Sequence, residues 1–452
     1  MLYRTLFKGL AWNTFESIAY QGILILHLIA LYRHTDPSFF GMMGIIFSLL
    51  YLMTFLANAG FDTALAPYAQ LLTTDRRFWH TIVIPHLRIQ CIVYVFIGIC
   101  GIIVNPPSLI RAISSASYGG HAITPYSLSI ILALLLVTES TKKTLRTIAH
   151  LTFHNQLTAL VEVSMVSIYV ALVWLSYAYY TALSLTLILF PLFITSLISC
   201  LILGCCLYDF YQHLPTESTE LIPTHRTFIS TRLYTYGAHL GHILFSSNFL
   251  IPFCALHIGL AHTGIFKLIS SITHTITTMV YKIFGPTSQA LFSHTSTNTY
   301  HDKQQLFFTL TQYLHHVLYG LIIFFVINYA KLIGTHLNTN NFSTPLIILF
   351  LVIQLTEHMF IVYEKFFIAH HRAAYLCILS LVSLTITGTL LLLPLPASPV
   401  MIMSLVLGIR MITISTLAIT AYHWFHIKPA LTLRADYLAV PLILAGIFFL
   451  CF

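Results

Sequence analysis

The sequence predicts an all-α membrane protein with about twelve transmembrane helices. Charged residues make up 8% of the 452 residues, whereas a soluble domain carries about 25%. Hydrophobic residues make up 58% of the chain, and the mean hydropathy is +0.86, so most of the surface must face lipid. The apolar runs do not alternate in polarity as the strands of a membrane barrel do, which favours helices.

The elements follow from the lengths of the apolar stretches, because a helix needs about 20 apolar residues to cross the hydrocarbon core. Stretches of that length fall at 10–32, 39–58, 81–104, 124–147, 154–177, 180–207, 228–253, 258–284, 305–328, 343–368, 372–394 and 398–424. A shorter apolar stretch at 437–452 is a candidate thirteenth helix. Arg4 and Lys8 precede the first stretch without a cleavage motif after it, which predicts a permanent anchor.

The distribution of lysine and arginine predicts the topology. With the N-terminus in the cytoplasm, most of these cations lie on the inner side, and only Arg33, Arg111 and Lys331 lie outside. This asymmetry is the one expected of inner-membrane topology. The net charge of +8 therefore reflects topology, and we expect no nucleic-acid partner.

The longest polar interruption inside the chain divides it into two halves. It spans about 208–226 and separates six apolar stretches from another six. We predict an N-terminal lobe at 1–207, a cytoplasmic linker at 208–226, a C-terminal lobe at 227–427 and a tail at 428–452. Two segments at the starts of predicted helices, 40–48 and 263–271, are weakly similar, because each has a glycine followed by apolar residues. Repeated halves with the substrate site between them are a transporter architecture.

Several short segments occur in a characteristic order. They are AWNTFESIAYQGILILHLIALYRHTDPSFFGMMGII (11–46), LANAGFDTALAPYAQ (56–70), FHNQLTALVEVSMVS (153–167), HTGIFKLISSI (262–272) and IFGPTSQALFS (283–293). Together they resemble the polysaccharide (oligosaccharidyl-lipid) flippases of the multidrug/oligosaccharidyl-lipid/polysaccharide exporter superfamily. The sequence departs from that pattern at Asn248, where an aspartate is usual, and at Phe266, where a tyrosine is usual.

The resemblance implies a fold and a function. The fold would be two six-helix bundles arranged as a V around a central cavity. The function would be flipping of a polyprenyl-diphosphate-linked oligosaccharide from the inner to the outer leaflet, for surface polysaccharide biosynthesis. Transport would proceed by ion-coupled alternating access in the bacterial cytoplasmic membrane, with membrane lipids and the lipid-linked oligosaccharide as partners.

Three cations lie within predicted helices and are candidate substrate-binding residues: Arg410, Lys267 and Arg88. A diphosphate that crosses an apolar core needs counter-charges, and arginine forks and lysine ammonium groups both bind phosphate oxygens. Arg410 lies mid-helix, too deep to reach either surface. Arg88 lies nearer the inner side, where its side chain can instead extend to the cytoplasm.

Five polar residues are candidates for ion coupling or for lining the cavity: Glu16, Gln21, Glu357, Glu162 and Asp62. A carboxylate suits coupling to protons or sodium because burial raises its pKa and a nearby cation lowers it. For each carboxylate a structural role, as an interhelical ion pair or at a helix end near the interface, stays open beside cavity function. Glu162 can pair with the helix at 124–147, and Asp62 can end its helix at the membrane face. For a further carboxylate, Glu139, pairing with Lys142 or Lys143 is the stronger hypothesis.

Two other functions fit the composition. A multidrug antiporter of the same superfamily would favour an acidic cavity for cationic drugs, against which Arg410 and Lys267 argue. A membrane-embedded polysaccharide polymerase or ligase would need a large outer loop or a clustered catalytic set, and the outer loops are short. We therefore expect a transporter rather than an enzyme. The eight cysteines lack metal-site spacing and there is no glycine-rich nucleotide motif, so no metal or cofactor is expected.

Overall fold

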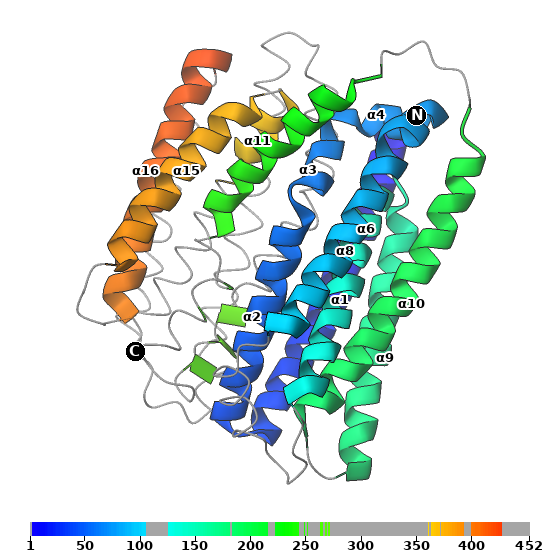
Figure 1. The fold of residues 1–452 in the computed structure, drawn as a ribbon, viewed down its shortest axis with the longest axis vertical. Coiled ribbons are helices and arrows are strands. Elements are labelled where there is room, and N and C mark those ends of the chain that lie inside the picture. The colour runs from blue at the N-terminus through cyan, green and yellow to red at the C-terminus, as the bar shows by residue number, and fades with distance from the viewer. Residues whose placement is uncertain are drawn as a thin grey trace. The chain divides into compact units, whose positions relative to one another are not determined.

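Every regular element among the residues that the computed structural model describes is a helix, and no strand forms among them (Figure 1). The described residues are 2–104, 125–180, 183–215, 222–243, 248, 251, 263–264, 267–268, 270–271, 360, 363–370, 372–392 and 399–426. The helical fold class predicted from the apolar stretches is therefore observed in the described part of the chain. Glu357 lies outside the described residues.

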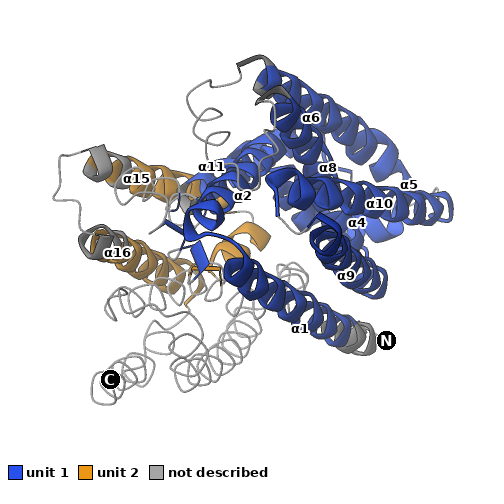
Figure 2. Cartoon of the chain, turned by 90° about the horizontal axis from the view of Figure 1, so that it is seen from below, with its two compact units in different colours: residues 1–268 blue, residues 269–452 orange. Residues whose placement is uncertain are grey.

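The chain forms two compact units, residues 1–268 and residues 269–452 (Figure 2). The longer described helices of the first unit are α1 (Leu2–His34), α2 (Pro37–Asn58), α6 (Ile84–Val104), α8 (Pro125–Leu151), α9 (Asn155–Tyr180), α10 (Leu185–Gln212) and α11 (His225–Ile243). Those of the second are α15 (Ala373–Leu392) and α16 (Pro399–Phe425). Helix α11 follows the predicted linker and packs against α3 (Phe61–Leu65) in the first unit. The lobe boundaries stay a prediction.

Local sequence sets both ends of α2. At its start, the Asp36 carboxylate accepts a hydrogen bond from the Ser38 amide at 3.0 Å, and Pro37 occupies the first helical position. At its end, Ala59 and Gly60 adopt positive φ angles of 47° and 75°. Glycine adopts this conformation without strain. The break places the short α3, with Asp62, directly beyond the end of α2.

Five helical segments of the described chain are long and apolar enough to cross a membrane. They are Ala11–His34, Pro37–Asn58, Arg76–Cys100, Asn155–Tyr180 and Leu185–Gln212. Helix α8 is not among them, although the sequence predicts a span at 124–147. Its second half carries Glu139, Lys142, Lys143 and Arg146, which lower its mean hydropathy. These charges are accommodated by pairing within the protein.

An aromatic core holds the short helices after α2 in place. Phe61, Phe78 and Phe228 are fully buried in it, and Trp79 is nearly so. The Trp79 indole donates a hydrogen bond to the Leu72 carbonyl at 2.8 Å, which satisfies its polar atom inside the core. Phe228 of α11 contacts Phe61 of α3 with ring centroids 6.2 Å apart. The core therefore fixes the start of α11 against α3.

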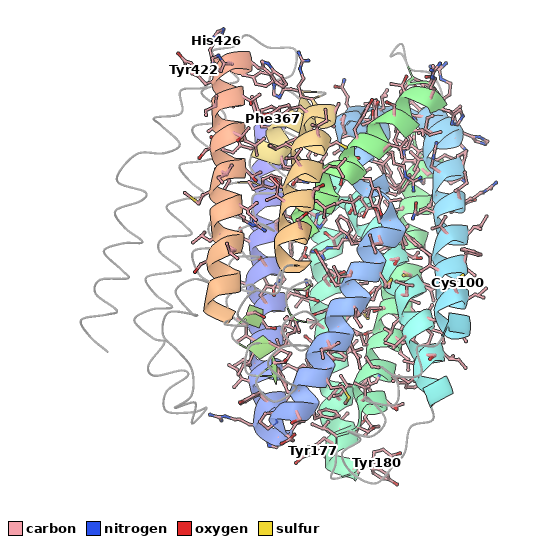
Figure 3. All side chains as sticks on the ribbon, turned by 60° about the vertical axis from the view of Figure 1, so that its left-hand side comes forward. Cys100, Tyr177, Tyr180, Phe367, Tyr422 and His426 are labelled. Carbon is pink, nitrogen blue, oxygen red and sulfur yellow. The ribbon has the colours of Figure 1, made fainter. Side chains whose placement is uncertain are left out.

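In the second unit, α15 and α16 pack through polar as well as apolar side chains. The Ser383 and Thr413 hydroxyls lie 2.9 Å apart, an interhelical bond of the kind that joins helices in membranes. Figure 3 shows Phe367, Tyr422 and His426 at one end of this unit. Aromatic packing at this end joins the short helix containing Phe367 to α16.

Candidate functional site

A network of buried and half-buried polar and charged side chains lies in the first unit where α1, α8, α9 and α10 pack together. Its members are Glu16, Glu139, Lys142, Arg146, His150, Glu162 and Ser196. The α8 members recur at intervals of three and four residues, which places them on one face of the helix. We call this set the ion network. It contains three carboxylates, one lysine, one arginine and one histidine.

Arg146 is the centre of the ion network. Its Nη2 donates to Glu16 Oε1, and its Nη1 lies 3.9 Å from Glu162 Oε2. Its Nε donates to His150 Nε2 at 3.4 Å. Glu16 is only 2% exposed. A planar guanidinium suits this place because its fork of donors can engage two carboxylates from two different helices.

His150 extends the network toward α9. Its Nδ1 lies 2.8 Å from Asn155 Oδ1, and its Nε2 lies 3.9 Å from Glu16 Oε2. An amide oxygen only accepts hydrogen bonds, so Nδ1 carries the proton, and the unprotonated Nε2 accepts from Arg146 Nε. His150 therefore joins Arg146 of α8 to Asn155 at the start of α9.

The second half of the network pairs Lys142 with Glu139 at 2.9 Å, as the i,i+3 spacing predicts. The Ser196 hydroxyl of α10 also donates to Glu139. Lys143, on the neighbouring face of α8, lies instead over the rings of Tyr51 and Phe55, at 5.9 and 5.5 Å from their centroids. Glu139 therefore has structural partners on two helices.

A polar contact continues along α1 and α9 beyond the ion network. The Trp174 indole donates to His27 Nδ1 at 3.2 Å, and His27 Nε2 lies 3.4 Å from the Tyr169 hydroxyl. Because an indole can only donate, neutral His27 carries its proton at Nε2 and faces Tyr169 with it. Figure 3 shows Tyr177 and Tyr180 at the end of α9, beyond this contact.

A second polar cluster lies at the break between α2 and α3. Asn58 Nδ2 donates to the Tyr94 and Thr144 hydroxyls at 3.2 and 3.3 Å, and these two hydroxyls lie 3.0 Å apart. We call Asn58, Tyr94 and Thr144 the polar trio. Asp62 lies beside it and is 7% exposed. Neither of the Asp62 carboxylate oxygens accepts a hydrogen bond from the residues that the structure describes.

The structure brings together only some of the residues predicted from sequence. Glu16 and Glu162 meet through Arg146, so the pairing of Glu162 with the helix at 124–147, one of the two roles left open by the sequence, is observed. Gln21 is buried on α1, and Asp62 is buried at the α2–α3 break. Their roles in ion coupling stay predictions.

The three predicted substrate cations differ in their settings, and none is a member of the ion network. Arg88 is exposed on α6, in keeping with a side chain that extends away from the protein. Lys267 packs its aliphatic stem against Gly44 of α2, where an added Cβ would come within 2.7 Å of Lys267 Cγ. Arg410 is buried on α16 in the second unit. Their roles in substrate binding stay predictions.

Sequence reasoning missed Arg146 and His150 because the positive-inside pattern assigned Arg146 to the inner surface. The signal that could have found them is the spacing of Glu139, Lys142, Arg146 and His150 along one helical face. Among the described residues, no group of three histidines, cysteines or carboxylates is placed to hold a metal ion.

Comparison with known proteins identifies solved structures that have the same fold. No protein-family model and no curated protein matches the sequence. Solved structures do match. One is described as an outward-facing multidrug resistance MATE family transporter of the MOP superfamily; it is 11% identical with a TM-score of 0.63 and covers 95% of this chain and 97% of its own. A MATE transporter in complex with MaD3S is 12% identical with a TM-score of 0.64, and the alignment covers 96% of each chain.

A third match is a MOP superfamily transporter from Pyrococcus furiosus, whose description states that reverse polarity of the binding pocket suggests a different function. It is 12% identical with a TM-score of 0.62, covering 94% of this chain and 96% of its own. The MATE transporters have 12 transmembrane helices in two bundles. The predicted fold class is therefore confirmed, and the chain has the fold of the membrane transporters of the MOP superfamily.

Proposed function

We propose that this protein is an ion-coupled membrane transporter that works by alternating access, with the ion network as its coupling site. The observation that carries the proposal is Arg146, which holds carboxylates of α1 and α9 together in a buried site. A proton or cation bound at Glu16 or Glu162 competes with the guanidinium for the carboxylate. Ion binding would therefore change how tightly α8 holds α1 and α9, which can bias one conformation over another.

Additional coupling or cavity residues in this proposal are Gln21, Asp62 and Glu357. The N-terminus would be cytoplasmic and the protein would reside in a bacterial cytoplasmic membrane, as the lysine and arginine distribution favours. The lobes at 1–207 and 227–427 would be the moving halves, joined by the linker at 208–226. A polymerase or ligase has no support from the fold.

The first candidate substrate class is cationic drugs, exported in exchange for protons or sodium. The support is the fold comparison, because solved structures with this fold are described as multidrug transporters, one of them in complex with a small molecule. The carboxylates of the ion network add to this support, since a buried acidic group can attract a cation or a proton. On the comparisons, this class is better supported than the flippase.

The second candidate substrate is a polyprenyl-diphosphate-linked oligosaccharide, flipped from the inner to the outer leaflet. The observation that favours it is the presence of buried or half-buried cations, Lys267, Arg410 and Arg232. The description of the Pyrococcus furiosus transporter indicates that pocket polarity varies within this fold. The fold alone therefore does not decide the charge of the substrate.

Transport in proteoliposomes tests both candidates. Vesicles containing the protein would receive either a proton or a sodium gradient, with a cationic rhodamine dye or a fluorescent polyprenyl-diphosphate sugar as the transported probe. We expect gradient-driven movement of one probe, abolished by Glu16→Gln or Glu162→Gln. Asp209→Asn, which removes an exposed carboxylate of α10, is the matched control and should leave transport unchanged. Transport that survives both network variants would overturn the proposed coupling site.

A further inference from the structure

Asp62 carries a buried carboxylate that no side chain of the described residues satisfies. It is 7% exposed, and neither of its two oxygens accepts a hydrogen bond from those residues. The Asp62 amide, by contrast, donates to Asn58 Oδ1 at 3.3 Å, so the backbone at this position is satisfied. Buried polar groups in folded proteins normally have a partner. The carboxylate therefore points to a partner that it meets in a different arrangement of its neighbours.

The guanidinium of Arg232, on α11, is close to this carboxylate but bonds elsewhere. The two charges interact electrostatically, and no ion pair joins them in the described part of the chain. Instead, Nε of Arg232 donates to the Ala59 carbonyl at 2.9 Å, and Nη2 donates to the Asn58 carbonyl at 3.4 Å and to Gln90 Oε1. All three acceptors are uncharged. A carboxylate is the stronger acceptor for a guanidinium, because both groups are charged and can form two parallel bonds.

The bonds that Arg232 makes in the structure cap the end of α2. The last carbonyls of a helix have no partner within the helix, and Arg232 supplies donors to those of Asn58 and Ala59. A cation is also favoured at this end of a helix by the helix dipole. Arg232 therefore has two favourable sets of acceptors at the α2–α3 break, the end of α2 and the Asp62 carboxylate, and the structure shows the first of them in use.

Uncharged contacts hold α11 in its observed position on the α2–α3 break. The backbone of α11 passes directly over Gly60, where an added Cβ would come within 2.6 Å of the Arg232 carbonyl oxygen and 2.9 Å of the Tyr236 nitrogen. The Thr235 hydroxyl also donates to the Gly60 carbonyl at 3.4 Å. Both contacts depend on the placement of α11 over Gly60. A displacement of α11 would break them and allow Arg232 to turn from the end of α2 to Asp62.

We propose that α11 has two docked positions on the α2–α3 break. In the observed position Arg232 caps α2, and in the second position Arg232 forms an ion pair with Asp62. Packed interfaces change between discrete arrangements rather than continuously, which suits such an exchange of partners. The inference rests on the proposed function, because alternating access requires elements that change position. It gives Asp62 a role distinct from ion coupling, as the acceptor that stabilises the second position of α11.

Distances between spin labels, measured by pulsed electron paramagnetic resonance on the full chain in nanodiscs, test the two positions. The labels are attached at Leu233→Cys on α11 and Leu201→Cys on α10, both exposed positions, in a chain whose native cysteines are replaced by alanine. We expect two distances, the first of which matches the structure. Asp62→Asn should lower the ratio of the second population to the first by about tenfold or more, the effect of losing one charge-assisted hydrogen bond.

Gly60→Ala should shift the populations in the opposite direction. Its added methyl group meets the backbone of α11 in the observed position, so the second population should grow. Thr235→Val removes the hydroxyl bond to Gly60 and should act in the same direction more weakly, which covers the case in which Gly60→Ala does not fold. The matched control Asp209→Asn, which removes an exposed carboxylate of α10, should leave the ratio unchanged.

A single distance in the wild type, in Gly60→Ala and in Thr235→Val would overturn the proposal. An unchanged population ratio in Asp62→Asn, or an equal change in Asp62→Asn and Asp209→Asn, would overturn it as well. The distance measurement needs no transported probe and is therefore separate from the transport assay. Two positions that depend on Asp62, without gradient-driven transport, would leave the exchange at the α2–α3 break and reject the proposed function, whereas transport with a single distance would do the reverse.

Discussion

Removing Arg146 while leaving its carboxylates in place should destabilise the protein strongly. In Arg146→Met, Glu16 loses its charged hydrogen-bond donor, and Glu162 loses the cation 3.9 Å away. Both carboxylates are buried, at 2% and 3% exposure. Removing one partner of a buried ion pair costs about 3–5 kcal/mol, because the remaining charge is left unpaired. We expect the unfolding free energy of Arg146→Met to fall by this amount.

The same reasoning predicts recovery when the stranded charges are removed. Adding Glu16→Gln and Glu162→Gln to Arg146→Met should restore more than half of the loss, because the site then contains no uncompensated charge. The assay is unfolding in detergent followed by circular dichroism, with exposed Arg33→Met as a control expected to change stability by less than about 0.5 kcal/mol. A loss below about 1 kcal/mol for Arg146→Met, or no recovery in the triple variant, would refute the reasoning.

Three further changes test other parts of the structure by the same unfolding assay. Gly264→Ala should cost about 1–3 kcal/mol, because the added methyl group meets the Pro37 carbonyl oxygen; an unchanged midpoint would show that this close approach is absent. Tyr94→Phe removes the hydroxyl from the polar trio and should cost about 1–3 kcal/mol, whereas a neutral effect would contradict the buried hydrogen bonds. Trp79→Phe should cost about 1–2 kcal/mol because the Leu72 carbonyl loses its donor, and a stabilised variant would argue against that bond.

Much of the fold could be predicted from the sequence because lipid imposes a simple rule on it. A span must be apolar over about 20 residues, so the stretches at 39–58 and 154–177 correspond closely to α2 and α9. Helix α8 is less well described by this hydropathy rule. It continues to Leu151, beyond the predicted end at 147, and it carries charges that are paired with side chains of neighbouring helices. Pairing between helices is not visible in a hydropathy pattern.

The candidate site was only partly predictable for the same reason. Glu16 and Glu162 stand out in the sequence because each is an isolated carboxylate in an apolar stretch. Arg146 does not, since cations near the inner end of a helix usually face water. The contacts of Arg232 could not be predicted for the same reason, because its sequence position indicates the inner membrane surface. Its hydrogen bonds go to backbone carbonyls that the break after Asn58 brings within its reach. Residue type and depth therefore identify candidates, whereas tertiary contacts decide which of them act together.

Substrate-driven ion movement in proteoliposomes examines the ion network most directly. A pH-sensitive dye, or a sodium-sensitive one, inside the vesicles would report ion flux when the transported probe is added outside. We predict flux with the wild type and with Asp209→Asn, and none with Glu16→Gln or Glu162→Gln. Wild-type flux in both network variants, with both correctly folded, would show that coupling occurs elsewhere in the chain.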